Sequence, residues 1–301
     1  MTRHSHGQTW RGSGAKAGWQ LTKSRRRLIA QVVSYFLLTI GGVVMALPFF
    51  WLISSSLKKP AQIFIIPPQW IPNPPKWSNY VELFTLLPFE LYTRNTLIIV
   101  VGTVSGQLIT GSMAAYAFSR LRWPGRDLVF VALLATMMLP GAVTMIPVFI
   151  IFKTLGWLNT FLPLIVPYWF GGGAFYIFLL RQFFLTIPME LEDAARMDGA
   201  SSFIIYTRIM LPLARPALAV VAIFSFMSNW NAFMGPLIYL SSNDKWTLAL
   251  GIQALQGLEW GRDMTELLMG AGFIMILPTL ILFIVAQDIF VRGVTLTGIK
   301  G

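Results

Sequence analysis

The sequence predicts an all-α polytopic membrane protein with six transmembrane helices. Of its 301 residues, 55% are hydrophobic and only 12% are charged, an apolar excess too large for a soluble domain. The hydrophobic residues also gather in runs, each near the ~20 residues that a helix needs to cross a bilayer. The six predicted spans cover residues 29–54, 95–118, 128–152, 162–184, 216–239 and 267–289.

Proline and glycine residues interrupt these runs. The prolines in or near them are Pro48, Pro140, Pro147, Pro163, Pro167, Pro236 and Pro278. A proline removes one backbone hydrogen bond, but neighbouring helices in a membrane protein can satisfy the freed groups, so we expect kinked spans. Small residues at Gly102, Gly106, Gly111 and 171–173 would let helices approach closely.

The distribution of Lys and Arg predicts how the chain is oriented. With the amino terminus in the cytoplasm, sixteen of the 23 basic residues fall in cytoplasmic segments, as the positive-inside rule requires. Six spans then place the carboxyl terminus in the cytoplasm as well. The net charge of +11 is therefore interpreted as an orienting signal, and we expect no nucleic-acid partner.

The amino-terminal segment 1–27 is basic and contains no acidic residue. Gly and Ser are frequent in it, which predicts a disordered cytoplasmic tail up to about Lys23. Its charge would retain it in the cytoplasm, and binding to anionic membrane lipid is a second possibility. The two histidines of the chain, His4 and His6, lie here, and we do not expect them to form a metal site.

The sequence lacks the common signatures of catalysis. It has no cysteine, no GxxxxGK[ST] phosphate-binding loop and no HExxH motif. We therefore expect no catalytic residue, no metal and no cofactor on this chain, so that any ATP hydrolysis falls to a partner. The middle of each predicted span also carries no ionisable residue, which argues against an ion-coupled carrier, since such carriers usually keep one there.

Residues 188–216 are the longest polar stretch that reads as ordered. Pro188 suits the first turn of a helix, where its missing N–H costs nothing. The carboxylates of Glu190, Glu192 and Asp193 suit the positive end of the helix dipole. Gly199 can adopt the left-handed conformation that ends a helix. This half of the stretch predicts a short acidic helix and a tight turn.

A second helix is predicted after the turn. Either Ser201 or Ser202 could cap its amino terminus, and the helix would run to about Met210. Pro212 and Pro216 would then end it and begin the next apolar run. The simplest interpretation of the whole stretch is a solvated connector, and the alternative is a surface that fills a groove on another protein.

The motif in this stretch resembles the EAA loop of the membrane subunits of ABC importers. In that loop an acidic residue and two alanines precede a glycine, followed further on by Ile-x-Leu-Pro. The matching residues are Asp193, Ala194, Ala195, Gly199, Ile209, Leu211 and Pro212. The family usually has Glu where this chain has Asp193, so the charge is kept on a side chain that is one methylene shorter.

Flanking residues resemble the carbohydrate branch of these permeases, of the maltose type. The stretches PPQWIPNPPKWSNY, NWNAF and QDIFVRGVTLTGIKG carry this resemblance outside the loop. It covers residues 28–301, which the resemblance identifies as the transmembrane domain. It implies a sugar or oligosaccharide as solute and a bacterial or archaeal plasma membrane as location.

The resemblance also implies partners and site residues. The partners are a second permease subunit, a pair of cytoplasmic ATP-binding subunits that hold ATP and Mg, and an extracytoplasmic solute-binding protein. The loop 188–216 would couple ATPase movement to alternating access. The coupling residues it implies are Glu190, Glu192, Asp193, Ala194, Ala195, Asp198, Gly199 and Pro212, and the tail residues implied to contact the ATPase are Lys300 and Gly301.

Neutral polar residues in the spans are candidates for a solute path. Asn229, Asn231 and Gln107 could line a path for a hydroxyl-rich solute, or could simply hydrogen-bond between helices. The proline-rich and aromatic segment 58–93 could mark the lipid headgroup region or dock an outer partner. Two functional alternatives stay open: an ABC permease for a solute other than sugar, and a stand-alone carrier.

Overall fold

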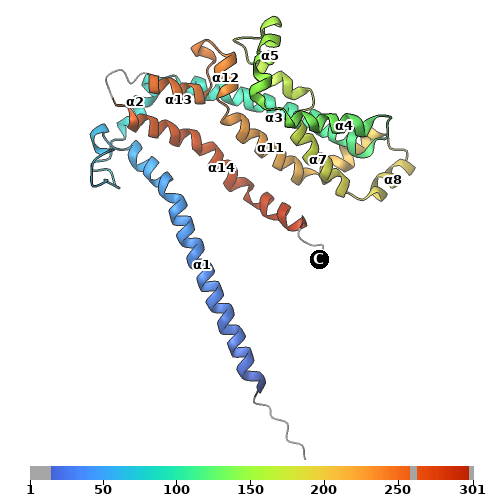
Figure 1. Cartoon of the computed structure of the whole chain (residues 1–301), viewed down its shortest axis with the longest axis horizontal. Helices are drawn as coiled ribbons and strands as arrows, with labels where there is room; N and C mark the ends of the chain where they lie inside the picture. Colours follow the sequence, from blue (N-terminus) through green and yellow to red (C-terminus); the bar gives the residue numbers. More distant parts are fainter. Residues whose placement is uncertain (1–14, 258–262, 298–301) are drawn as a thin grey trace, which may run out of the picture. The chain divides into compact units, whose positions relative to one another are not determined.

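The computed structural model describes the backbone of residues 15–257 and 263–297, and side-chain surroundings for 25–256 and 263–287 (Figure 1). Every regular element in these ranges is helical, as the composition predicted. Four helical segments are long and apolar enough to cross a membrane: Arg25–Ser56, Phe89–Arg120, Leu162–Thr186 and Thr265–Gln287. Two sharply bent helix pairs raise the number to six if each pair counts as one span.

The chain divides between Ser54 and Ser55 into two units. The first consists mainly of helix α1 (Ala15–Ser56), which contains the first predicted span and Pro48. This helix begins inside the tail that the sequence predicted to be disordered up to Lys23. The stretch after Ala15 is rich in Ala, Lys, Gln, Leu and Arg, which are good helix formers, and extending an existing helix costs less than nucleating a new one.

Helix α3 (Phe89–Arg120) is the centre of the second unit. It packs along most of its length against α7 (Ala174–Thr186) and α11 (Arg215–Trp230) (Figure 1). Two of the predicted small residues, Gly102 and Gly106, let α3 approach the 3-10 turn η3 (Val166–Trp169) closely. A Cβ atom added to Gly106 would lie 2.5 Å from the Trp169 ring, and the Trp169 indole donates a 3.0 Å hydrogen bond to the Gly102 carbonyl.

The third predicted span is not one helix. Helix α4 (Arg126–Ala135) runs into the 3-10 turn η2 (Thr136–Met138), and α5 (Gly141–Thr154) then leaves at an angle of 103°. The break falls at Leu139 and Pro140, where a residue that precedes proline is disfavoured in the α-helical conformation. The sequence predicted a kinked helix here, and the structure has a broken span instead.

The fourth span is also interrupted. Helix α6 (Leu162–Ile165) and the 3-10 turn η3 (Val166–Trp169) precede α7. Between them Gly171, Gly172 and Gly173 have positive φ angles of 98°, 70° and 97°, which only glycine adopts freely. Polar groups of α3 cover this break: Gln107 Nε2 donates to the Gly172 carbonyl, and the Gly171 N–H donates to Thr110 Oγ1 at 3.2 Å. Irregular backbone inside a membrane protein needs such partners.

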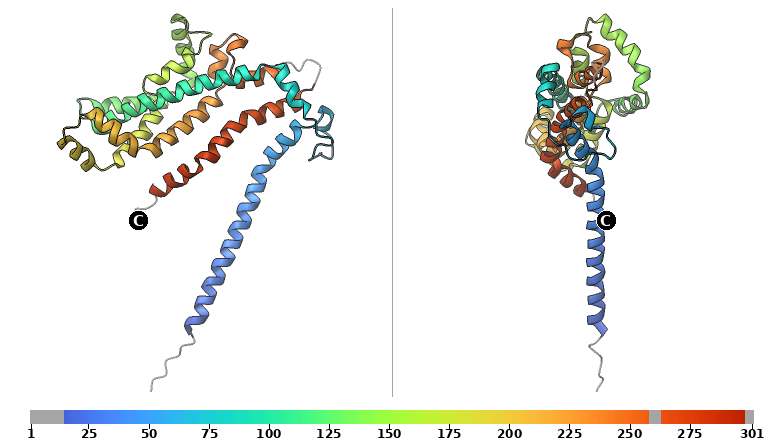
Figure 2. Two further views of the ribbon diagram at one scale, coloured as in Figure 1. Left: turned by 180° about the vertical axis from the view of Figure 1, so that it is seen from behind. Right: turned by 90° about the vertical axis from the view of Figure 1, so that its left-hand side faces the viewer.

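The fifth predicted span divides into α11, which ends at Trp230, and the short helix α12 (Met234–Tyr239). Helix α14 (Thr265–Thr297) contains the sixth span and Pro278. It packs against α11, α2 (Ser78–Leu86) and α13 (Leu248–Gly257) (Figure 2). Short 3-10 turns η1 (Pro60–Gln62) and η5 (Asn243–Lys245) complete the connections. The predicted tail residues Lys300 and Gly301 lie outside the described residues.

Candidate functional site

The predicted acidic helix is present as α8 (Met189–Met197). Pro188 precedes it in extended conformation, and Glu190 and Glu192 lie in its first turn, where the helix dipole favours carboxylates. The helix lies at one end of the bundle of α3, α7 and α11, near α4 (Figures 1 and 2). The predicted site therefore begins where the carboxyl-terminal end of α3 meets the end of α7.

A Schellman turn ends α8 at Gly199. This glycine has φ +81°, its N–H donates to the Arg196 carbonyl at 3.0 Å, and the next N–H, of Ala200, donates to the Ala195 carbonyl at 2.9 Å. An added Cβ atom would meet nothing within 4 Å. The requirement for glycine is therefore conformational and not steric, as the sequence predicted.

The two alanines and the acids divide between two faces of α8. Ala195 packs, with Ala200, against the hydrophobic cluster formed around Phe184, Tyr206 and Met210. Ala194 is exposed. Glu190, Asp193 and Asp198 are exposed as well, whereas Glu192 is buried. The helix thus presents three carboxylates to the outside and directs the fourth into the protein.

Glu192 forms an ion-pair network with two arginines. Its Oε1 accepts a 2.8 Å hydrogen bond from Arg196 one turn later, and its Oε2 lies 3.9 Å from Arg120 Nε at the end of α3. The side chains of Arg120 and Glu192 are each only 2% exposed. Tyr116 also donates to Glu192 Oε1 at 3.4 Å. The hydrogen bond to Glu192 raises the pKa of the Arg196 guanidinium.

Arg120 joins three elements. Its guanidinium donates to the carbonyls of Phe184 and Ile187 at the end of α7, and to the sulfur of Met189 at the start of α8. As the last residue of α3 it also lies at the negative end of that helix dipole, which favours a cation. The sequence analysis did not single out Arg120. The feature that could have identified it is its position as a basic residue at the end of an apolar run.

The second predicted helix begins at Ser201. The Ser201 hydroxyl accepts a 3.4 Å hydrogen bond from the Ile204 N–H, which confirms the predicted cap. Helix α9 (Ser202–Ile205) continues through a π-helical turn η4 (Tyr206–Met210) into α10 (Leu211–Leu213). The sequence predicted that the helix ends at about Met210, before Pro212. In the structure the helix continues to Leu213, so Pro212 lies within it.

The π-helical turn explains how this proline is accommodated. Proline cannot donate the N–H that an α-helix uses four residues back, and a wider turn just before it absorbs the mismatch. The chain bends by 77° only at Ala214, between Ser202–Leu213 and α11. The Tyr206 hydroxyl lies 2.7 Å from Ser112 Oγ, which ties η4 to α3.

Apolar side chains accompany the acids on the exposed surface of this site. Met197, at the end of α8, is 88% exposed, and Phe203, after the turn, is 66% exposed. Leu191 is also exposed. Sequence reasoning concentrated on the acids and missed these residues. These side chains are available to a partner that covers this surface.

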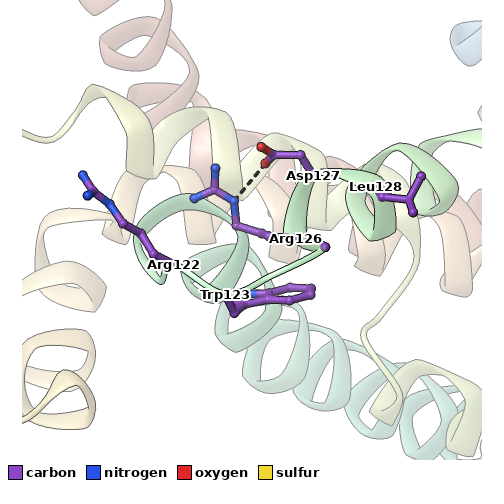
Figure 3. Close-up of a pocket in the computed structure, with 6 residues that line it drawn as sticks. Arg122, Trp123, Arg126, Asp127 and Leu128 are labelled. Atoms are coloured by element: carbon purple, nitrogen blue, oxygen red, sulfur yellow. Dashed lines mark hydrogen bonds and ion pairs between the residues drawn. The ribbon is translucent and has the colours of Figure 1, made fainter.

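The loop that follows Arg120 forms a second feature at this end of α3. A cavity of about 310 Å³ is lined by residues that include Arg122, Trp123, Arg126 and Asp127. Figure 3 shows how their side chains lie. Arg126 is held by Asp127 Oδ1 at 2.9 Å and by the Leu121 carbonyl at 3.2 Å. These bonds fix the turn from α3 into α4.

The three predicted solute-path residues do not come together. Asn229 lines a cavity of about 220 Å³ near the other end of α3. Gln107 is fully buried against the Gly172 carbonyl in the middle of α3. Asn231 is exposed and donates to the Met227 carbonyl of its own helix at 2.8 Å. The apolar runs that placed all three residues in spans could not show which direction each side chain faces.

Comparison with known proteins gives a consistent result. Residues 107–296 match the family described as binding-protein-dependent transport system inner membrane component. The diacetylchitobiose uptake system permease protein NgcG of Streptomyces coelicolor is 32% identical over 268 residues, which cover 88% of this chain and 86% of NgcG. The galactooligosaccharides transport system permease protein GanQ of Bacillus subtilis is 33% identical over 279 residues, covering 92% and 98%.

A solved structure agrees with these relatives. A chain of the crystal structure of a bacterial ABC transporter involved in the import of the acidic polysaccharide alginate superposes with a TM-score of 0.76 at 27% identity. The match covers 88% of this chain and 97% of that one. The chain therefore belongs to the binding-protein-dependent transport system inner membrane components, the permeases of ABC importers.

Proposed function

We propose that this permease imports a sugar or oligosaccharide, because the relatives are named for diacetylchitobiose and galactooligosaccharides. It works beside a second permease subunit, with a pair of cytoplasmic ATP-binding subunits and an extracytoplasmic solute-binding protein. ATP and Mg are held by the ATP-binding subunits, and this chain needs no cofactor of its own. Both termini lie in the cytoplasm, as the Lys and Arg distribution favours.

Helix α8 is the coupling element in this proposal. The observation that carries it is the division of α8 into an exposed acidic face and a buried face anchored to α3. Glu190, Asp193 and Asp198 offer carboxylates to the ATPase, while Met197 and Phe203 fill apolar positions in its groove. A short amphipathic helix in a groove is a recurrent way for one protein to hold another.

Glu192 and Arg120 have a different task from the exposed acids. Their side chains are buried inside the permease, so the ion pair transmits the movement of α8 to α3 and is not available to the ATPase. Helix α3 in turn packs on α7 and α11. When the ATP-binding subunits close, the loop follows, and these helices move as a group to change which side of the membrane the solute path faces. The ATPase must bind one of the two states better to drive this change.

Purification of the tagged chain in mild detergent tests this function. The importer proposal expects a second permease, an ATP-binding subunit and a solute-binding protein to copurify, and expects sugar-dependent ATP hydrolysis after reconstitution. If the chain is recovered alone after stabilising cross-links, and moves solute without ATP, the stand-alone carrier is correct instead. Stimulation only by an amino acid or polyamine would keep the importer and contradict the sugar.

A further inference from the structure

The turn between α3 and α4 joins a charged segment to an apolar one. Its cavity of about 310 Å³ is lined by Arg122, Trp123, Gly125, Arg126, Asp127 and Leu128. Helix α4 begins one of the two bent helix pairs that are apolar enough to cross a membrane. Leu128 is 75% exposed, and Val131, on the same face one turn later, is 61% exposed. The cavity therefore lies where an exposed apolar surface meets charged residues, which is the level of the lipid headgroups in a membrane protein.

The charges around this cavity do not balance. Asp127 is the one acidic residue in its lining, and Asp127 Oδ1 accepts a 2.9 Å hydrogen bond from Arg126 Nε. Arg122 is exposed, and it forms no ion pair with any carboxylate in the described part of the chain. Figure 3 shows its side chain extending away from Asp127. The guanidinium of Arg122 is therefore available to an anion from outside the chain.

Arg126 is held in place and keeps further donors. Its Nε donates to Asp127, and its Nη1 donates to the Leu121 carbonyl at 3.2 Å. A guanidinium carries five N–H groups, so the two on Nη2 remain without an acceptor among the described residues. Because the side chain is already fixed, binding an anion costs it little further conformational entropy.

A row of aromatic rings fixes Trp123 at the edge of the cavity. The Trp123 ring lies 5.8 Å from Phe118, and Phe118 lies 5.4 Å from Phe130, measured between ring centroids. Phe118 and Phe130 are buried, whereas Trp123 is 37% exposed. The guanidinium of Arg181, from α7, lies 4.2 Å from the centroid of the Phe130 ring. The row thus places a tryptophan, a residue typical of membrane interfaces, beside three arginines.

We propose that this cavity binds the headgroup of an anionic phospholipid. Arg122 and Arg126 hold its phosphate, and Trp123 and Leu128 contact its glycerol and the first carbons of an acyl chain. Arginine suits phosphate because its N–H groups match two phosphate oxygens at once. A zwitterionic headgroup would add an ammonium group, which the excess of arginine charge repels.

A lipid fits this surface better than a soluble partner does. An acidic surface of another protein would neutralise Arg122 but would leave the apolar side chains of Leu128 and Val131 uncovered. A phospholipid supplies both chemistries in one molecule, with the charge at the turn and the acyl chains along α4. The site also lies next to Arg120, at the end of α3 that carries the contacts with α8.

Binding measurements on charge variants test the site. The permease is purified with the subunits that accompany it, and native mass spectrometry follows a titration with phosphatidylglycerol. Arg122→Gln should weaken this binding about fivefold, the contribution typical of one basic residue near an anionic membrane surface, and should not change phosphatidylcholine binding. Arg122→Lys keeps the charge and should retain most of the affinity. Arg94→Gln removes an exposed arginine near the other end of α3 and should bind like the unaltered protein.

Photolabelling locates the lipid. A phosphatidylglycerol with a photoreactive group at the start of one acyl chain is placed in nanodiscs with the permease, and the labelled peptides are identified by mass spectrometry. Label should concentrate in residues 123–131. Unlabelled phosphatidylglycerol should compete, whereas phosphatidylcholine and free glycerol 3-phosphate should not. In Arg122→Gln the label in this segment should fall about fivefold, as the binding does.

Each contrary result overturns the site in a different way. Equal losses of phosphatidylglycerol binding in Arg122→Gln and Arg94→Gln would show an effect of overall charge and no site. Competition by glycerol 3-phosphate would show that the cavity takes a soluble phosphate. Label that is present on the permease alone but absent once the ATP-binding subunits are attached would show that those subunits cover this surface. The proposed importer function stands under all of these results.

Discussion

Glu192 of α8 and Arg120 of α3 face each other in the interior of the protein, with Oε2 and Nε 3.9 Å apart and both side chains 2% exposed. Neither atom makes a hydrogen bond to a described residue, so their attraction is purely ionic at this distance. The pair connects α8, the proposed coupling helix, to α3, the central helix of the second unit. In the proposed mechanism, this connection carries the movement of α8 to the spans.

Replacing one member of this ion pair should cost more stability than its share of the loss when both members are replaced together. Glu192→Leu leaves the Arg120 charge buried without its carboxylate, which typically costs ~3–5 kcal/mol of stability. The double variant Arg120→Leu/Glu192→Leu should lose less than the sum of the two single variants, because it leaves no uncompensated charge. Thermal unfolding of the purified complex measures both effects. Additive losses would show that the two charges do not interact.

Gly199→Val should uncouple transport while the permease still inserts. Valine is β-branched and pays a penalty of roughly 1–2 kcal/mol for a left-handed backbone, although nothing would clash with its Cβ atom. The turn would therefore change direction and displace α8 relative to α9. Gly199→Asn, which tolerates the left-handed conformation, should retain most uptake. Normal uptake by Gly199→Val at normal expression would contradict the account.

Asp193→Lys should weaken docking of the ATP-binding subunits without affecting folding. The side chain is exposed, and surface substitutions usually change stability by less than ~0.5 kcal/mol, whereas a reversed charge in the interface repels the partner. The amount of ATP-binding subunit retained on the tagged permease measures the loss. Asp193→Glu, which keeps the charge, is the matched control. If both variants retain the same amount of ATP-binding subunit, Asp193 does not lie in the interface.

Gly106→Ala should destabilise the contact between α3 and η3. Its new Cβ atom would lie 2.5 Å from the Trp169 ring, so the indole or the helix has to shift. Overpacking of this kind costs ~1–3 kcal/mol. Gly141→Ala introduces the same methyl group where nothing lies within 4 Å. This variant should unfold at the same temperature as the unaltered protein. Identical unfolding temperatures for both variants would contradict the packing described here.

Local chemistry accounts for what the sequence predicted well. The start of α8, the turn at Gly199 and the cap at Ser201 depend on backbone preferences of single residues, and all three are present. The breaks near Pro140 and at 171–173 were harder to predict, because hydropathy records that a segment is apolar and not whether it is one helix. The prediction that Pro212 ends the second helix was wrong, because a π-helical turn accommodates this proline within the helix.

Tertiary contacts account for what the sequence could not predict. Glu192 and Asp193 are neighbours with the same charge, yet one is buried against Arg120 and the other is exposed. Glu192 has a local partner in Arg196, one turn later, but that pair alone does not bury it. The partner that lies beside it in the interior, Arg120, is more than 70 residues away in the sequence. In the same way, Asn229 reaches a cavity and Gln107 a glycine carbonyl because of how the spans pack.

A cross-link from Met197 tests the central claim, that α8 docks on the ATP-binding subunit, most directly. Met197→Cys places the chain's single thiol at a position that is 88% exposed on α8, where a benzophenone maleimide can be attached. Illumination of the assembled importer should join this permease to the ATP-binding subunit, and Glu90→Cys, exposed at the start of α3, should not form that adduct. If Met197→Cys reacts only with lipid or detergent in an importer that still transports, α8 is not the coupling helix.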